Sequence, residues 1–323
     1  MISFIIIGRN EGWKLIKCFG SVFETIKHNK LNEYEVIYVD SNSTDSSIDI
    51  AKDFKEVKIY KLVSGYNAAV ARNIGAEKAS GENLFFIDGD MEIIADFLPL
   101  IFNEREGLLY NFVSGQFIEY YYDLNDNYID KKEYHAMNDK DQYEATTGGL
   151  FCIKKDVWLS VGGMKTKYKR SQDLDFGLRL AKKGVKLLRK KEIMARHHTM
   201  YHLEKYTTFK ILPNYYQLYS RSLLYRDHML NQSIIRIILR NDYTMVLLII
   251  CSILSFSMIN YLPFSFYILT IIIRSIINAN RKINVILKLV VHYIYRDIIS
   301  ILGFILFFPS KINDSDIKYI KIR

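Results

Sequence analysis

The chain has 323 residues, half of them hydrophobic, and a formal net charge of +9 at neutral pH. The basic charge does not point to nucleic acid as a partner, because neither a recognition-helix motif nor an RNA-binding signature accompanies it. The length suits one α/β domain of about 210 to 230 residues and a smaller region of different character.

Short runs of β-branched and aromatic residues alternate with segments of helical spacing in the first part of the chain. These runs are residues 2–7, 36–39, 58–62 and 84–87. Residues 13–28 carry apolar side chains at helical offsets, which predicts an amphipathic helix covering a sheet. A second helix is expected to begin at Thr44 or Asp45, since both are good caps. This alternation predicts an α/β fold with a mostly parallel central sheet.

Polar residues follow three of the predicted strands, in the loops 8–12, 40–45 and 88–90. Ligands of parallel α/β sheets bind beyond the carboxyl ends of the strands, so we expect these loops to line one site. Asp40 can accept hydrogen bonds from a base imide or a ribose hydroxyl, which would select a nucleotide. Roles for Asp40 and Asp45 in a turn and a helix cap are equally compatible with the sequence.

Arg72 is a candidate phosphate ligand in the segment AVARNIGAEKASGENLFF. Its guanidinium group can bind a phosphate through two hydrogen bonds, and the alternative is a solvated charge on a helix. The sequence contains neither the Gly-rich dinucleotide fingerprint nor a P-loop motif, so a nucleotide would have to be held in another way.

Asp88 and Asp90 directly follow a predicted buried strand in the segment LFFIDGDME, residues 84–92. Hard divalent cations take oxygen ligands, and Mg²⁺ sites typically combine one or two carboxylates with the phosphates of the substrate. Gly89 lets the backbone come close to a ligand. Because Asp-Gly-Asp is also ordinary turn chemistry, the hypothesis of a cation site depends on the neighbouring motifs.

Two segments in the middle of the chain bear on substrate contact. Residues 119–145 are polar and rich in Tyr and Asn, which predicts a surface insertion or a mobile loop on the acceptor side. Residues 146–163 predict a Gly-rich approach, a strand, a short helix and a Gly-Gly turn. Gly148 and Gly149 would let the backbone pass close to a donor or acceptor sugar.

Two adjacent histidines follow a predicted strand near residues 186–188. A neutral imidazole of His197 or His198 could complete the shell of a cation or bind a phosphate, although a surface or core histidine is the commoner outcome. Between the two, His198 is marginally preferred as a metal ligand.

Four segments occur together in the order and spacing of a known family. They are FIIIGRNE, VIYVDSNSTDSS, ARNIGAEKASGENLFFIDGDME and QDLDFGLRLAKKG, and they span residues 3 to about 200. Together they resemble the motifs of glycosyltransferase family 2, whose members have the GT-A fold. The resemblance implies a nucleotide-diphosphate sugar as donor, Mg²⁺ or Mn²⁺ as cofactor, and a glycan or lipid-linked acceptor.

The resemblance also implies roles for individual residues. Asp40 would contact the nucleoside, Arg72 the donor, Asp88 and Asp90 the metal and diphosphate, Gly149 a donor or acceptor sugar, and Asp173 would be the catalytic base. The family usually has Glu-Asp where this chain has Gln172 and Asp173. That departure keeps the base but puts acceptor contacts in doubt.

The chemistry of sugar transfer matches these carboxylates. A hydroxyl that attacks an anomeric carbon must lose its proton, and Asp173 could accept it as general base. A cation held by Asp88 and Asp90 would stabilise the departing diphosphate. One base and one metal on opposite sides of the sugar suit a single displacement with inversion. Asp175 lies on the same predicted helix, residues 172–184, and is expected to orient the local structure.

Beyond about residue 210 the chain becomes apolar. Residues 244–262 carry no charge and approach the roughly 20 residues that cross a bilayer core. Pro263 ends this run and a shorter one follows before Arg274, so we expect a membrane hairpin or one span with a re-entrant piece. Residues 285–308 carry a polar stripe, more typical of a helix in the interface or against polar partners.

These patterns predict three regions: a GT-A catalytic domain in residues 1–215, an amphipathic connector in 216–242 and a membrane-associated helical region in 243–323 that contacts lipids. The connector could equally be a helix packed on the catalytic domain. Basic residues flank the apolar runs, and the first residues lack the basic region of a signal peptide. We therefore expect a cell-membrane protein whose catalytic domain is cytoplasmic.

Two other functions remain compatible with the sequence. A nucleotidyltransferase also places Asp pairs at strand ends, but it would need a basic phosphate loop that GRNEGWK barely resembles. A catalytically inert membrane protein could keep the α/β domain for binding or assembly.

Overall fold

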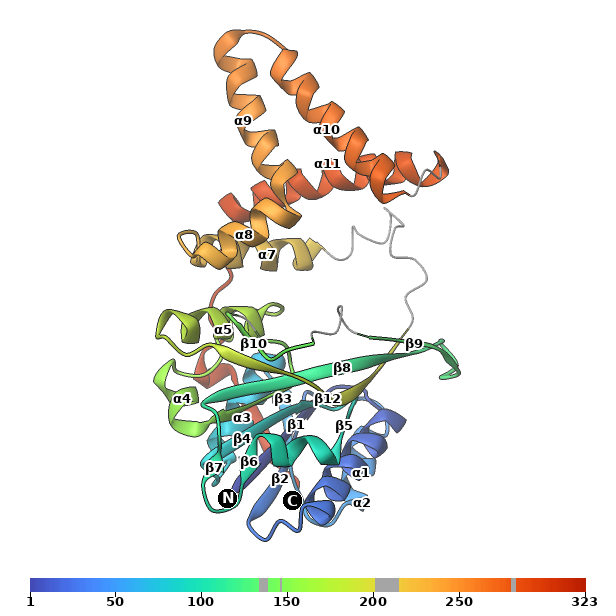
Figure 1. Cartoon of the computed structure of the whole chain (residues 1–323), viewed down its shortest axis with the longest axis vertical. Helices are drawn as coiled ribbons and strands as arrows, with labels where there is room; N and C mark the ends of the chain where they lie inside the picture. The colour runs from blue at the N-terminus through green and yellow to red at the C-terminus, as the bar shows by residue number, and fades with distance from the viewer. Residues whose placement is uncertain (134–138, 146, 201–214, 280–282) are drawn as a thin grey trace. The chain divides into compact units, whose positions relative to one another are not determined.

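The computed structural model describes residues 1–133, 139–145, 147–200, 215–279 and 283–323 (Figure 1). The chain divides into two compact units, one formed by residues 1–201 with 310–323 and the other by residues 202–309. Each unit is described by itself. The functional division into a catalytic domain, a connector and a membrane-associated region stays a prediction.

Parallel strands form one half of the main sheet. They are β1 (Ile2–Gly8), β2 (Tyr34–Asp40), β3 (Val57–Ser64) and β4 (Asn83–Asp88), in the spatial order β4-β1-β2-β3. Both faces of β1 are buried, which explains why its sequence is apolar apart from Ser3 and the final Gly8. Phe4 and Ile6 pack with the core on one face, and Ile5 and Ile7 pack with the core on the other.

Helices cover both faces of this half. They are α1 (Trp13–His28), α2 (Ser47–Asp53) and α3 (Ala68–Lys78). Leu15 and Phe19 of α1 bury their side chains in the first core, whereas Val70 and Ile74 of α3 bury theirs in the second. The bounds predicted for the first helix are confirmed, and α2 begins two to three residues later than expected.

The other half of the sheet is largely antiparallel, so the sheet as a whole is mixed (Figure 1). Its strands are β5 (Met91–Ile93), β8 (Phe112–Tyr122), β9 (Tyr128–Glu133), β10 (Gln142–Glu144), β11 (Phe151–Lys154) and β12 (Leu187–Met200). A two-stranded sheet of β6 (Phe102–Asn103) and β7 (Gly107–Leu108) follows the 3₁₀ helix η1 (Ala95–Leu100). The predicted α/β fold is confirmed, and the sheet is mixed, with parallel pairing among β1 to β4 and between β8 and β12.

One expectation for this half stays open and another fails. In the described part of residues 119–145, the end of β8 forms an antiparallel pair with the exposed strand β9, so a surface insertion or a mobile loop on the acceptor side stays a prediction. The strand expected near residues 186–188 extends to Met200 as β12 and contains both histidines. Half-exposed strands in polar sequence lack the apolar runs that mark the buried strands.

Aromatic packing fixes α4 (Lys155–Ser160) and α5 (Gln172–Lys182) on the sheet. The ring of Trp158 lies 4.6 Å from that of Phe86 and 4.7 Å from that of Phe176, measured between centroids. The predicted Gly-Gly turn is present after α4, with φ of 68° at Gly162 and 65° at Gly163. This packing fixes α5 on the sheet, and the first turn of α5 carries Asp173.

Residues 310–323 return to the first unit and extend its sheet. After the short helix η3 (Asp314–Asp316), strand β13 (Lys318–Lys321) pairs antiparallel with β3 and covers that edge of the sheet. Arg323 then donates hydrogen bonds to four carbonyl oxygens at the end of α2 and the start of β3, those of Ala51, Lys52, Phe54 and Val57. The sequence had placed this segment in the membrane-associated region.

Replacing Arg323 with Ala should lower the free energy of unfolding of the first unit by about 1 to 2 kcal/mol. The reason is that the carbonyl groups at the end of α2 lose the charged donor that caps them. Lys321→Ala is the matched control, because Lys321 is an exposed residue at the end of β13, two residues before Arg323. It should change stability by less than about 0.5 kcal/mol. Urea denaturation measures both. Equal effects of the two variants would show that the guanidinium contacts contribute nothing.

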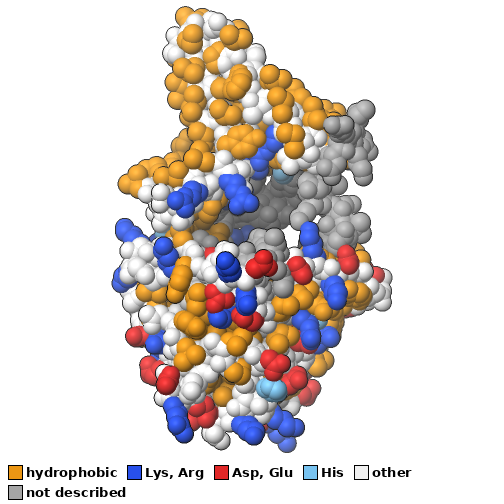
Figure 2. Space-filling model, in the orientation of Figure 1, with side chains coloured by type: hydrophobic (Ala, Val, Ile, Leu, Met, Phe, Trp, Pro, Cys, Tyr) orange, Lys and Arg blue, Asp and Glu red, His pale blue; other side chains and the backbone are white. Residues whose placement is uncertain are grey.

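The second unit is helical in its described residues. Its helices are α7 (Tyr215–Asp227), α8 (Gln232–Asn241), α9 (Tyr243–Met258), α10 (Leu262–Asn278) and α11 (Ile283–Leu306). Many large apolar side chains of α9 and α10 are exposed, including Phe256, Leu262 and Ile277 (Figure 2).

One described helix, over Val285–Leu306, is long and apolar enough by itself to cross a membrane. A second candidate arises if α8 and α9 are taken together across their 83° bend. Helix α9 alone has 16 residues and α10 has 17. A core helix of a soluble protein can have the same length and composition as α11, so a membrane span at α11 is not established. The hairpin predicted for the runs that form α9 and α10 also remains a prediction.

Candidate active site

The carboxyl ends of three parallel strands meet at one edge of the sheet. Gly8 of β1 lies in register with Asp40 of β2, and Ile7 lies in register with Asp88 of β4. The backbone N–H of Gly89 donates to the carbonyl oxygen of Ile7 at 2.8 Å, which draws the Asp88–Asp90 loop against β1. The sheet therefore places the loops named from the sequence next to one another.

Asp40 is fully buried at the end of β2. Its Oδ1 accepts a hydrogen bond from the hydroxyl of Tyr38 at 3.0 Å, and its Oδ2 accepts one from the backbone N–H of Ser43 at 2.8 Å. Asp45 accepts from the N–H of Ser47 at the start of α2, at 3.0 Å. Both carboxylates thus have the turn and cap contacts that the sequence left open, and a nucleoside contact for Asp40 stays a prediction.

Arg72 of α3 is buried and ion-paired with Asp88. Its Nη2 lies 2.5 Å from Asp88 Oδ1 and 3.5 Å from the carbonyl oxygen of Gly149, and the residue is 2% exposed. This burial rules out a solvated charge. The Nε and Nη1 atoms of Arg72 are buried with no hydrogen-bond partner among the described residues, so the guanidinium retains donors for a further acceptor.

Burial raises the pKa of Asp88, and the nearby charge of Asp90 adds to this rise, while Arg72 opposes it. The side chain of Asp88 remains 31% exposed, so a ligand can still reach it. Asp88 is thus a partly accessible carboxylate anchored on one side by a buried cation.

Gly149 leaves no room for a side chain beside this pair. A Cβ atom at Gly149 would lie 2.0 Å from Asp88 Oδ2 and 2.8 Å from Arg72 Nη2. The absence of a side chain is what allows the backbone to pass over the Arg72–Asp88 pair.

Gly149→Ala should lower kcat/KM by about 10²-fold, because the methyl group displaces the carboxylate and guanidinium that line the site. Gly148→Ala is the matched control, since a Cβ atom there meets nothing within 4 Å. Steady-state kinetics of the two variants test this. Loss of activity in both would mean that loop flexibility is responsible, and retained activity in Gly149→Ala would place substrate elsewhere.

The side chain of Asp90 faces His197, which lies on strand β12. His197 Nε2 lies 3.2 Å from Asp90 Oδ2, and Lys14 Nζ lies 4.0 Å from the same oxygen. Burial by itself would lower the pKa of His197, but the carboxylates of Asp90 and Glu119 raise it to about 10. Burial acts to raise the pKa of Asp90. The hydrogen bond from His197 and the positive charges of His197 and Lys14 outweigh burial, so the pKa of Asp90 is lowered.

His198 does not face Asp90 with its ring. Its Nδ1 lies 2.9 Å from the hydroxyl of Tyr122, its Nε2 lies 2.9 Å from Glu92 Oε2, and the residue is 2% exposed. Only its backbone contacts the loop, through the N–H donated to the carbonyl oxygen of Asp90. Side chains alternate along a strand, so the two histidines point to opposite faces of β12. The geometry thus favours His197 over the His198 preferred from the sequence.

Asp90 and His197 fit one part of a cation shell. Among the described residues no group of three or more His, Cys, Asp and Glu side chains forms a ready-made metal site. A carboxylate oxygen and an imidazole nitrogen, 20% and 21% exposed, can still serve Mg²⁺ or Mn²⁺ if substrate phosphates supply further oxygens. The donor set therefore fits a cation that binds together with a diphosphate.

Asp173 lies in the first turn of α5, within electrostatic reach of Arg72 and Asp88. Its Oδ1 accepts a hydrogen bond from the N–H of Leu174 at 2.9 Å. Burial raises the pKa of Asp173, Arg72 opposes the rise, and Asp88 adds to it. Asp88 is thus within electrostatic reach of both Asp90 and Asp173, and all three carboxylates lie in one unit.

Asp175 is fully buried and orients this region, as the sequence predicted. It pairs with Arg179 Nε at 2.8 Å and with Lys165 Nζ at 3.3 Å. Arg179 in turn donates to the carbonyl oxygens of Val161 and Gly163 at 2.7 and 2.8 Å. These bonds tie α5 to the Gly-Gly turn, so Asp175 has a structural task.

Several residues near the site were missed in the sequence. Lys14 pairs with Glu11 at 2.6 Å, Glu119 lies 3.7 Å from His197 Nδ1, and Glu92 holds His198. Charged residues next to the GRNEGWK and DGDME motifs were the available signal for Lys14, Glu11 and Glu92. Glu119 had no local signal, because it reaches the site only through the pairing of β8 with β12.

Comparison with known proteins places this site in a family. The model of the family described as Glycosyl transferase family 2 matches residues 3–224. An uncharacterized glycosyltransferase of Haemophilus influenzae is 34% identical over 91 residues, 27% of this chain and 32% of that protein. The glycosyltransferase GlyA of Streptococcus pneumoniae is 27% identical over 141 residues, 40% of this chain and 20% of that protein. The chain thus spans about a third or less of these relatives' length.

A solved structure shares the fold. GalNAc-T7, determined with UDP, GalNAc and Mn²⁺, aligns with a TM-score of 0.50 and 18% sequence identity over 63% of this chain and 44% of that one. The alignment agrees with the α/β architecture and mixed sheet described above. With the family match over more than half of the residues, the chain belongs to glycosyltransferase family 2 and has the GT-A fold.

Proposed function

We propose that the chain is an inverting glycosyltransferase that moves a sugar from a nucleotide-diphosphate donor to a hydroxyl of a glycan or lipid-linked acceptor. The observation that carries the proposal is the Arg72–Asp88 pair at the strand ends, with Asp90 and Asp173 within electrostatic reach of Asp88. This constellation lies inside the segment that matches the family.

Arg72 and Asp40 are assigned to donor binding. The unpartnered Nε and Nη1 atoms of Arg72 can donate to phosphate oxygens, and the Asp88 carboxylate keeps the guanidinium in place. Asp40 supports the loop after β2, and strand β1 separates it from Asp88 on β4. A nucleoside could extend along this edge of the sheet from the diphosphate to Asp40. Gly149 lets the backbone approach the sugar phosphate.

Asp90 and His197 would hold Mg²⁺ or Mn²⁺ together with the diphosphate. When bound, the cation neutralises charge that develops on the departing nucleoside diphosphate. Asp88 would either bind the cation as well or, through its ion pair, orient Arg72 toward the phosphates. The Mn²⁺ in the GalNAc-T7 structure belongs to a protein of the same fold and supports a divalent cation for this chain.

Asp173 is assigned as the general base. A base is most effective when its pKa lies near the working pH, and burial moves the pKa of Asp173 in that direction. The carboxylate takes the proton of the acceptor hydroxyl as that oxygen attacks the anomeric carbon and the diphosphate leaves. Attack and departure on opposite sides of the carbon invert its configuration.

Membrane association is proposed for the helical unit. Exposed apolar side chains on α9 and α10, the apolar stretch Val285–Leu306, and basic residues of α8 such as Arg236 and Arg240 support contact with an anionic, cytoplasmic leaflet. An acceptor carried by a lipid or a growing cell-surface polysaccharide would then be within reach of a membrane-bound enzyme.

A thermal-shift screen of UDP, GDP and dTDP sugars with Mn²⁺ should identify one donor class that raises the melting temperature more than Mn²⁺ or the nucleotide alone. Ligands that bind only the native state stabilise it in proportion to affinity and concentration. With the stabilising donor, release of a nucleoside diphosphate supports sugar transfer. Formation of a nucleotide sugar from a nucleoside triphosphate and a sugar 1-phosphate, with release of pyrophosphate, would instead identify a nucleotidyltransferase. No donor-dependent shift would indicate an inert binding protein.

A further inference from the structure

A network of buried charges lies inside the helical unit. Asp242 has a side chain that is 3% exposed, and it lies 3.3 Å from Arg221 Nη1 and 3.4 Å from Arg296 Nη2. Asp297, with a side chain 1% exposed, lies 3.4 Å from the same Arg296 nitrogen. Together with Arg274 these residues are named the helical charge cluster. Asp242, Asp297 and Arg296 are largely buried, whereas Arg221 is 44% exposed. Burying a charge is costly unless it is paired.

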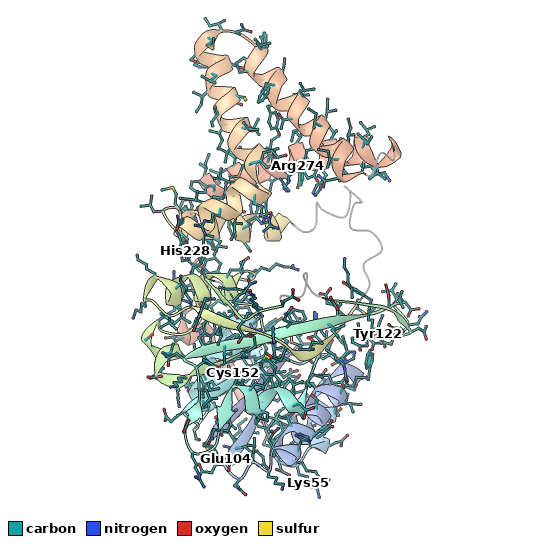
Figure 3. The ribbon with its side chains drawn as sticks, viewed as in Figure 1. Lys55, Glu104, Tyr122, Cys152, His228 and Arg274 are labelled. Carbon is teal, nitrogen blue, oxygen red and sulfur yellow. The ribbon has the colours of Figure 1, made fainter. Side chains whose placement is uncertain are left out.

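The cluster has more positive than negative groups, with three guanidinium groups facing two carboxylates. Arg274 makes no ion pair within the described part of the chain. It donates to Thr244 Oγ1 at 2.9 Å and to the carbonyl oxygen of Asn241 at 2.8 Å, and its guanidinium carbon lies 4.4 Å from the ring centre of Tyr293. Figure 3 labels Arg274 within the helical unit. Arg274 thus has Asp297 only within electrostatic reach, with no carboxylate in direct contact among the described residues.

Two buried nitrogens of α11 also lack partners. Arg296 Nε and His292 Nδ1 have no hydrogen-bond partner among the described residues. They are four residues apart and so lie on one face of the helix. Arg274 from α10 lies close enough to His292 to act on it electrostatically, as Arg296 does. Arg274 and Arg296 also donate to the same acceptor, the carbonyl oxygen of Asn241 at the end of α8, at 2.8 and 3.3 Å. The two guanidinium groups and the ring of His292 therefore lie close together.

A tetrahedral anion with several oxygens would satisfy this arrangement. Guanidinium groups bind phosphate through paired, charge-assisted hydrogen bonds, and a neutral imidazole that carries its hydrogen on Nδ1 can donate a third. The surrounding helices present apolar side chains outward, among them Leu269, Ile273 and Ile277 of α10 (Figure 2). Such an apolar surface favours an anion that is attached to hydrocarbon chains, as the phosphate of a phospholipid is.

We propose that the helical charge cluster binds the phosphate of a lipid headgroup, held by Arg274, Arg296 Nε and His292 Nδ1. Asp242 and Asp297 balance the other guanidinium charge and fix Arg296 between the helices. The site concerns lipid binding alone, so it stands whether or not the chain transfers sugar.

Flotation of the full chain with vesicles tests the site. Vesicles of phosphatidylcholine containing either phosphatidic acid or phosphatidylserine are adjusted to equal surface potential, so that general charge attraction is the same. The full chain should bind phosphatidic acid, whose phosphate is unshielded, about tenfold more tightly. Equal binding to the two vesicles would overturn the proposal.

Arg274→Gln should remove this tenfold preference. Arg240→Gln on the exposed side of α8 is the matched control, and it should weaken binding to both vesicles by about the same factor, up to roughly fivefold, and keep the preference. A preference that survives in Arg274→Gln would contradict the assignment. The melting temperature with UDP and Mn²⁺ reports the first unit separately, so loss of lipid preference is distinguishable from loss of donor binding.

A second variant guards against misfolding of the first. His292→Gln keeps the volume and leaves the Arg274 contacts with Thr244 and Asn241 in place, and it should lower the preference for phosphatidic acid several-fold. Inorganic phosphate without vesicles distinguishes the source of the ligand. A rise in melting temperature with phosphate, combined with no lipid preference, would assign the site to a free anion and overturn the lipid proposal.

Discussion

Asp173→Asn is expected to lower kcat by about 10²- to 10⁴-fold and to leave donor affinity unchanged. The amide has the shape of the carboxylate and can still accept the hydrogen bond from the N–H of Leu174, but it cannot take a proton from the acceptor hydroxyl. Single-turnover transfer and donor titration measure the two quantities separately. A variant that turns over at the parental rate would place the base elsewhere.

Asp156→Asn is the matched control. Asp156 lies in the first turn of α4 as Asp173 lies in the first turn of α5, and its Oδ1 likewise accepts from the following backbone N–H. It is exposed and outside the site, so the control should keep its activity. Loss of activity in both variants would indicate a general effect on helix starts.

The pH dependence of the parent protein follows from the environment of Asp173. Burial raises its pKa above the ordinary 3.8, and the base acts only when ionised. The rate should therefore fall as the pH drops through this raised value, and the acid limb should vanish in the residual activity of Asp173→Asn. A buried carboxylate is unfavourable when ionised, so the variant should melt no lower than the parent at neutral pH.

Asp90→Asn is expected to abolish the Mn²⁺ dependence of donor binding and to lower the transfer rate by about 10³-fold. The amide loses the negative charge that would hold the cation, and it ends the ion pair with His197. The rate and the shift in melting temperature with donor and Mn²⁺ measure the effect. An unchanged response to Mn²⁺ would remove Asp90 from the metal site.

Asp96→Asn gives the control for Asp90. Asp96 also pairs with a histidine, His28, at 2.9 Å, but its side chain is 82% exposed and lies outside the site. Breaking this pair should change neither the rate nor the Mn²⁺ response. The comparison separates the loss of an Asp–His contact from the loss of a cation ligand.

The parallel half of the fold could be predicted because its strands are buried on both faces. Runs such as FIII and LFFI have no polar interruption, and a carboxylate at a strand end then marks the sheet edge, as Asp40 and Asp88 do. The mutual approach of Asp88, Asp90 and Asp173 needed the further knowledge that α5 packs on the sheet through Trp158 and Phe176.

The choice between His197 and His198 could not be made from the sequence. Neighbouring residues in a strand point to opposite faces, and only the pairing of β12 with β5 and β8 decides which face meets Asp90. The same limit applies to β13, because its partner β3 lies far away in the chain, and the contact between Ser64 and Asp316 spans 252 residues. Long-range pairing of short polar strands leaves no local pattern.

Anomalous diffraction from a crystal of the full chain with UDP and Mn²⁺ tests the central claim most directly. The account predicts one manganese peak roughly 2.1 Å from an Asp90 carboxylate oxygen, bridged to the diphosphate, with Arg72 on the phosphates and Asp173 facing the vacant sugar position. A diphosphate bound without manganese near Asp90, or manganese on a different surface, would contradict it.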